Sequence, residues 1–264
     1  MHQVQVHNFS YGLINPVLGY MMSCLGAFLG LRCITRARAY TGAGRALWLC
    51  LASVSLGTTG IWVMHFIAML GFTIPGQVIL YNVPITMVSM LLAVLVVGIG
   101  LFIVGYSDGG PLPVLAGGLV IGVGVATMHY VGMSAMRMPD VVRYSTGLVA
   151  VSVLIAIVAG TAALWTGLRV RGVWSTLGAS LVMGLAVSGM HYTGMAAMHI
   201  AAPSQSGGGG QMAMTGLPAE GFLLPLLLGV SIVTFLTALL LALAPSEAEI
   251  HEDATLTERL RATR

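Results

Sequence analysis

The stretch Met190-His191-Tyr192-Thr193-Gly194-Met195-Ala196-Ala197-Met198 ends an apolar segment of helical length. A close copy runs from Met128 to Met136, and a more degenerate copy runs from Met64 to Met69. The histidines that the copies share are His65, His129 and His191. They lie 64 and 62 residues apart, and self-similarity at a nearly fixed period indicates a repeat architecture. We therefore expect three copies of one structural unit.

The composition predicts a membrane protein. Hydrophobic residues make up 57% of the chain and charged residues 7%, and the mean hydropathy is +0.95. A helix needs roughly 20 residues to cross the hydrocarbon core of a bilayer. The segments that are long enough are 10–34, 46–71, 83–105, 112–136, 146–168, 174–198 and 221–244. We expect an all-α integral membrane protein with seven transmembrane helices, made of three helix hairpins and a final helix.

The arginines predict the orientation, because basic residues collect in short loops on the cytoplasmic side. Nine arginines fall on one predicted face and two on the other; the nine are Arg32, Arg36, Arg38, Arg45, Arg169, Arg171, Arg259, Arg261 and Arg264. This bias indicates an external N-terminal segment at 1–9, a membrane domain at 10–244 and a short cytoplasmic tail at 245–264. The three histidines then lie near the outer ends of the second, fourth and sixth spans.

The three copies run in the same direction along the chain, and each occupies the second helix of a hairpin. Parallel repeats of this kind suggest that the second, fourth and sixth spans pack around a common centre with pseudo-threefold symmetry. The alternative is that the repeats are spread along a row. Only the first arrangement brings the three imidazoles together.

The residue types around each histidine point to a metal. On a helix, residues i, i+4 and i+7 share a face, so one imidazole and two thioethers form a stripe in each complete copy. Thioether sulfur is soft and selects Cu(I), and imidazole also suits copper. The predicted copper ligands are His65, His129, His191, Met69, Met133, Met195, Met64, Met128 and Met190. The accessory candidates at i+7 are Met136 and Met198.

Other side chains have two interpretations each. His2 and His7 either supply accessory ligands or belong to a mobile terminus. His199, at the predicted mouth of the sixth span, is a further accessory candidate. Tyr130 and Tyr192 either donate hydrogen bonds around the site or belong to the interfacial aromatic belt. The methionines can also serve as packing residues, and the histidines as interhelical hydrogen-bonding groups.

These motifs resemble the MHYT domain, a bacterial membrane module named for the tetrapeptide that Met190-His191-Tyr192-Thr193 reproduces in full. The resemblance covers about residues 7 to 244. It implies a multi-pass protein of the bacterial plasma (inner) membrane with seven transmembrane helices and an outward N-terminus. It also implies a copper site of methionines and histidines that senses oxygen, carbon monoxide or nitric oxide. Many relatives carry a cyclic-dinucleotide enzyme domain or another signalling domain after the last span. Here only a short tail is expected, so we predict a stand-alone member that is not itself an enzyme.

Missing residue types exclude several rival functions. The sequence contains no lysine, which rules out a retinal Schiff base, and it has no charged residue in mid-span for a proton relay. It also has no phosphate-binding loop and no basic patch for nucleic acid. The predicted partners are membrane lipid, a diatomic gas and an unknown cytoplasmic output protein. The alternatives are a membrane protein that accepts, transports or stores copper, and a haem-binding membrane protein.

Overall fold

The computed structural model describes residues 6–139, 141–201 and 216–245. Among these residues seven helices are long and apolar enough to cross a membrane, which confirms the predicted fold class. The second span, Gly42–Leu70, consists of three consecutive helices: α2 (Gly42–Val54), the π-helix η1 (Ser55–Val63) and α3 (Met64–Leu70). The other helices are α1 (Ile14–Ala39), α4 (Val83–Gly105), α5 (Pro111–Ser134), α6 (Thr146–Arg169), α7 (Val173–Ala196) and α8 (Ala219–Leu243).

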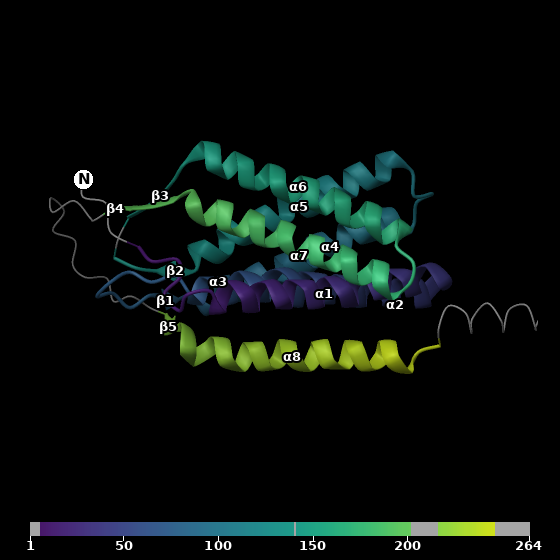
Figure 1. Cartoon of the computed structure of the whole chain (residues 1–264), viewed down its shortest axis with the longest axis horizontal. Coiled ribbons are helices and arrows are strands. Elements are labelled where there is room, and N and C mark those ends of the chain that lie inside the picture. Colours follow the sequence, from purple (N-terminus) through teal and green to yellow (C-terminus); the bar gives the residue numbers. More distant parts are fainter. Residues whose placement is uncertain (1–5, 140, 202–215, 246–264) are drawn as a thin grey trace, which may run out of the picture.

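Six of these spans form a closed ring. Helix α1 contacts the second span and α7, α4 contacts the second span and α5, and α6 contacts α5 and α7. Helices with and without the motif therefore alternate around the ring, as expected for three hairpins about a common centre. Helix α8 lies outside the ring against α1 and η1, as Figure 1 shows. The arrangement in a row is wrong.

Short strands join the loops at one end of the bundle, which we call the histidine end (Figure 1). Strand β1 (Leu80–Tyr81) pairs with β2 (Met136–Arg137) and β5 (Leu217–Pro218), and β3 (Val141–Tyr144) pairs with β4 (Met198–Ala201). All pairs are antiparallel. Because β1, β2 and β4 follow the first, second and third motif, this pairing ties the ends of the motif helices to neighbouring loops.

Local sequence explains where the helices begin. Asn82 caps α4, because its side chain accepts a hydrogen bond from the backbone N–H of Ile85 at 3.0 Å, and Pro84 lies in the first turn. Pro111 is the first residue of α5, a position where a missing N–H breaks no helical hydrogen bond. Gly172 turns the chain from α6 into α7 with φ +81°, a conformation that other residues rarely adopt.

The predicted spans differ from the helices mainly at two places. Helix α1 continues to Ala39, so Arg36 and Arg38 lie on its last turn rather than in a loop. Helices α5 and α7 end at Ser134 and Ala196, two residues earlier than the spans predicted to reach 136 and 198. The chain leaves both helices to form β2 and β4, and such short strands carry no recognisable hydrophobic period in the sequence. Of the tail predicted at 245–264, residues 246–264 lie outside the described residues, as do residues 1–5.

Arg36 attaches α8 to the ring. Its side chain is 5% exposed, and its Nη2 donates hydrogen bonds to the carbonyl oxygens of Leu241 at 3.3 Å and Ala244 at 3.1 Å. The last carbonyls of a helix have no partners within the helix, and a cation near them is favourable. Arg36 therefore closes the C-terminal end of α8 against α1.

We expect Arg36→Gln to lower the free energy of unfolding by about 1.5–3 kcal/mol, the usual contribution of hydrogen bonds to a charged group. The measurement is thermal unfolding in detergent. Arg38→Gln is the matched control, because Arg38 is exposed two residues further along the same helix. Equal effects of the two substitutions would show that Arg36 does not hold α8.

Candidate metal centre

The three motif histidines meet at the centre of the ring. His65 comes from α3, His129 from α5 and His191 from α7. The centroids of their rings are 4.9, 5.0 and 5.1 Å apart, and the ring planes cross at 80–88°. Each side chain is at most 1% exposed. The repeat thus places three buried imidazoles around one point.

The ring nitrogens that face this point are spaced for a metal ion. His65 Nδ1 lies 3.1 Å from His191 Nδ1 and 3.1 Å from His129 Nδ1. One nitrogen from each ring can be chosen so that all three lie within 4.8 Å of one another. Around a metal at about 2.0 Å from each nitrogen, trigonal or tetrahedral ligands are about 3.3–3.5 Å apart. Small ring movements would complete such a set.

Hydrogen bonding alone does not satisfy this cluster. A neutral imidazole has one N–H donor and one acceptor, so His65 Nδ1 can pair fully with only one of its two neighbours. The Nε2 atoms of all three rings are buried without a hydrogen-bond partner among the described residues. A cation can accept the three Nδ1 lone pairs at once, with the proton of each ring on Nε2. It therefore fits the three facing Nδ1 atoms better than hydrogen bonds between the rings.

A glycine in each later motif makes room for a histidine of the copy before it. A Cβ atom added to Gly132 would lie 2.6 Å from Nε2 of His65, and a Cβ atom added to Gly194 would collide with Nε2 of His129. This role could not be predicted from the sequence, in which the repeated glycine is only one residue of the motif. Ala68 holds the same position in the first copy.

We expect Gly194→Ala to displace the His129 ring and to weaken metal binding by about 10–100-fold, the range for residues that orient a ligand. The measurement is a metal titration of the purified protein. Gly189→Ala is the control on the same helix, because nothing lies within 4 Å of a Cβ atom there. If Gly194→Ala binds metal with unchanged affinity, the His129 ring can shift without loss of its place in the metal site.

The methionines occupy several different surroundings. One turn after each histidine lie Met69, Met133 and Met195, all buried at 5% exposure or less. Among the methionines that precede the histidines, Met64 packs against Gly19 of α1, Met190 lines a cavity between the helices, and Met128 is buried in the core. These positions do not test whether the sulfur atoms bind a metal, so the sulfur ligands stay predictions.

The helical stripe predicted to reach the i+7 methionines is wrong. Met136 lies in β2 and Met198 in β4, beyond the ends of α5 and α7. Both helices close with tight turns, since the N–H groups of Ala135 and Ala197 bond to carbonyls three and four residues earlier. Helical spacing therefore no longer relates these two methionines to His129 and His191.

The outlying histidines lie away from the cluster. His7 is exposed, and its backbone pairs with Thr73 through hydrogen bonds of 2.9 and 2.8 Å, so this part of the N-terminal segment is held in place. His199 is exposed in β4 opposite Arg143. Neither belongs to the three-histidine group, and His2 lies outside the described residues.

An aromatic ring braces each histidine edge to face. The ring of Phe66 lies 4.8 Å from that of the preceding histidine, measured between ring centroids. The rings of Tyr130 and Tyr192 each lie 4.9 Å from that of the histidine before them. The hydroxyl of Tyr130 donates to Ser152 Oγ of α6 at 2.7 Å. All three copies share the contact between an aromatic ring and the histidine, and this contact needs no hydroxyl. This explains why phenylalanine can replace tyrosine in the first copy.

Comparisons with known proteins agree with this architecture. The family model for MHYT, the bacterial signalling protein N-terminal repeat, matches residues 59–117 and 122–180. MucR of Pseudomonas aeruginosa, a bifunctional diguanylate cyclase/cyclic di-GMP phosphodiesterase, is 32% identical over 97% of this chain and 37% of its own length. NbdA, a cyclic di-GMP phosphodiesterase of the same species, is 36% identical over 75% of this chain and 26% of its own length.

A third relative, the signaling protein YkoW of Bacillus subtilis, is 30% identical over 74% of this chain and 25% of its own length. The chain thus spans between a quarter and two fifths of these curated relatives. No solved structure matches it significantly. Three motif copies, seven apolar helices and the matches to bacterial signalling proteins lead to one conclusion: the chain belongs to the MHYT family of multi-pass proteins of the bacterial plasma membrane.

Proposed function

We propose that this chain is a membrane sensor module in which His65, His129 and His191 hold copper, and that it senses a diatomic gas or a change of redox state there. The observation that carries the proposal is the convergence of three buried imidazole nitrogens. The group contains no carboxylate among the described residues. Such a nitrogen set, with thioethers one turn away, suits copper better than magnesium or calcium.

The protein side chains would hold and shield this centre. Bound copper would supply a site whose coordination responds to a gas ligand or to one-electron chemistry. The three imidazoles bind and orient, while the rings of Phe66 and the two motif tyrosines fix their planes. Burial of all three histidines excludes bulk water and strengthens local electrostatic interactions.

A contact between buried hydroxyls links the span of His65 to α8, the helix that leads toward the predicted cytoplasmic tail. Thr59, six residues before His65 on the same span, has its hydroxyl 2.7 Å from that of Thr234 on α8, and both side chains are buried. Arg36 holds the far end of the same helix. A ligand shifts an equilibrium only through different affinities for two states. We propose that movement of His65 reaches α8 through Thr59.

The names of two relatives suggest the kind of output. MucR and NbdA are enzymes of cyclic di-GMP turnover, and this chain matches only part of each. By analogy, the module would control a signalling activity of that class. The output would be attached to the end of α8 or carried by a separate cytoplasmic protein.

The geometry favours a sensor over the alternative functions. Haem needs room for a macrocycle between two axial ligands, and rings about 5 Å apart at mutual right angles leave none. Copper transport needs further ligands along a path. Among the residues that line the space beneath the cluster, Met183 and Met190 offer soft sulfur and Ser23 offers a hydroxyl, and the others are aliphatic side chains or glycine. This lining does not make a continuous chain of ligands that leads away from the histidines.

The test is elemental analysis and an optical spectrum of detergent-purified protein. Wild type is compared with the triple variant His65→Ala, His129→Ala and His191→Ala. We expect copper near stoichiometry in the wild type and none in the folded triple variant. An intense Soret band would replace copper with haem, and a folded wild type that takes up no copper would overturn the proposal.

A further inference from the structure

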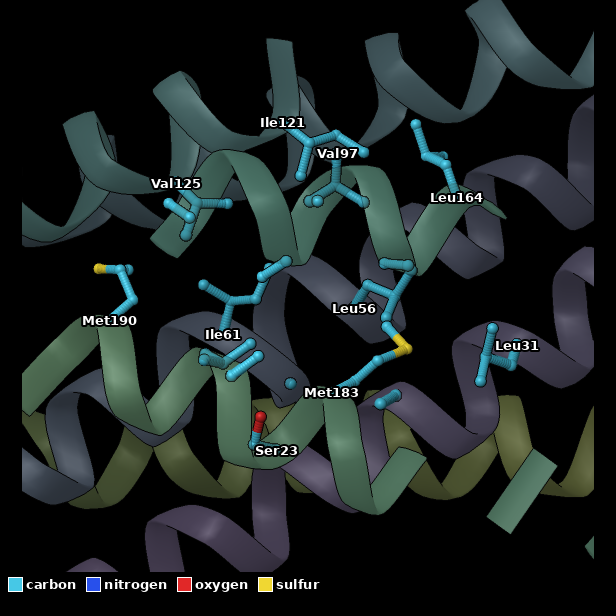
Figure 2. Close-up of a pocket in the computed structure, with 18 of the residues that line it drawn as sticks. Ser23, Leu31, Leu56, Ile61, Val97, Ile121, Val125, Leu164, Met183 and Met190 are labelled. Carbon is cyan, nitrogen blue, oxygen red and sulfur yellow. The ribbon is translucent and has the colours of Figure 1, made fainter. Parts of the chain in front are cut away.

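A cavity of about 60 Å³ lies directly beneath the histidine cluster. Residues from all six ring helices line it, so it lies inside the ring (Figure 2). Three of them, Ile61, Val125 and Val187, each precede a motif histidine by four residues. Residues four apart share a helix face, so these side chains form the layer one turn below the imidazoles. The cavity therefore begins where the candidate metal centre ends.

The cavity extends away from the histidines along the bundle. Figure 2 shows Ile61, Val125 and Met190 gathered at one end, and Leu31 and Leu164 at the other. Met190 directly precedes His191 in the sequence, so the wall of the cavity is continuous with the histidine cluster.

The side chains that line the cavity favour an apolar occupant. Ser23 is the one polar side chain among the lining residues, and the remainder are aliphatic side chains, thioethers or glycine. Water needs two to four polar partners to stay in a cavity, and apolar cavities remain dry and bind apolar guests such as xenon. One water needs roughly 10–15 Å³ on this measure, so the volume of about 60 Å³ admits a molecule larger than water.

We infer that the cavity is a binding chamber for a small uncharged apolar molecule of the size of a diatomic gas, and that it supplies this molecule to the inner side of the histidine cluster. Such molecules dissolve in the hydrocarbon that surrounds the helices, whereas water and ions do not. The role in sensing rests on the proposed function, but occupancy of the chamber does not. The chamber concentrates the gas beside the centre and keeps water away from it.

The walls offer matched positions for a test. Ala163 on α6 is half-buried and lines the cavity, while Ala162, its neighbour on the same helix, is exposed and does not. Ala163→Leu adds volume to the chamber, and Ala162→Leu makes the same chemical change on the outer face. Ala186→Leu fills the chamber from α7 and serves if Ala163→Leu does not fold.

Xenon is the probe, because it is apolar and needs no metal. We expect xenon to bind the wild type and Ala162→Leu, in xenon-pressurised crystals or by ¹²⁹Xe NMR, and binding to be lost in Ala163→Leu. Copper content, measured in the same samples, should be equal in all three. The optical response of the copper-loaded protein to carbon monoxide should be slower in Ala163→Leu than in Ala162→Leu.

The outcomes separate this inference from the proposed function. Xenon bound in a protein that takes up no copper would support the chamber and remove the sensor centre. A copper-loaded protein without bound xenon, an acyl chain occupying the cavity, or equal xenon binding in Ala163→Leu would overturn the chamber and leave the copper centre standing.

Discussion

Replacing His65 with alanine is expected to lower copper affinity by more than about 100-fold, beyond the 10–100-fold typical of residues that only orient a ligand. His65 is the hub of the cluster, because its Nδ1 makes both of the 3.1 Å contacts to the other two rings. Without it, only one ring nitrogen from His129 and one from His191 remain to bind copper. Copper then has an incomplete nitrogen set.

The effect should also appear in stability. A ligand at 100 times its dissociation constant stabilises the folded state by about 2.7 kcal/mol. We expect added copper to raise the unfolding temperature of the wild type and to leave that of His65→Ala unchanged. In the presence of a chelator the two proteins should differ less, because the substitution also removes an imidazole whose Nε2 is buried without a partner among the described residues.

His199→Ala is the control for this experiment. His199 belongs to the third motif region but lies exposed in β4. Copper should stabilise His199→Ala as it does the wild type. If copper still stabilised His65→Ala by the wild-type amount, the metal would bind elsewhere and the three-histidine centre would be wrong.

The sequence was sufficient to predict the depth of the histidines and their repetition. A period of 62 to 64 residues, with each motif near the end of an apolar segment, places the three imidazoles in one layer. Their convergence was one of two packings that the sequence allowed. The choice depends on how six helices close into a ring, which is decided by side-chain contacts among all of them.

Other features could not be predicted because they depend on exact helix ends and close approaches. Met136 and Met198 looked helical by spacing, yet each helix ends just before them. The π-helix η1 has no sequence signature comparable to a period or a cap. The match between Gly132 and Nε2 of His65 depends on the rotation of two helices. The cavity likewise is a property of assembled surfaces.

Gly26→Ala is expected to produce the largest loss of stability of any single methyl addition discussed here. A Cβ atom at Gly26 would collide with the backbone N and Cα of Gly60 in η1, and it would lie 2.8 Å from the carbonyl oxygen of Ser55. Small residues allow membrane helices to approach this closely. Overpacking usually costs about 1–3 kcal/mol, and we expect more than about 3 kcal/mol because backbone atoms cannot rotate away.

A graded series separates this effect from a general sensitivity to alanine. At Gly30, one turn along α1, the new Cβ atom would meet the side chain of Leu56, which can adjust, so Gly30→Ala should cost less. At Gly178 on α7 nothing lies within 4 Å, and Gly178→Ala should behave like the wild type. Thermal unfolding and the yield of monodisperse protein in detergent measure the order of stability of the three variants.

The substitution should also affect the candidate centre. Helix η1 continues directly into α3, which carries His65, so pushing η1 away from α1 moves one of the three imidazoles. We expect folded Gly26→Ala to bind copper more weakly than Gly30→Ala, although neither glycine lies in a motif. If Gly26→Ala matched Gly178→Ala in both stability and copper affinity, the α1–η1 contact would not determine where His65 lies, and the coupling proposed from His65 to α8 through η1 would lose its physical basis.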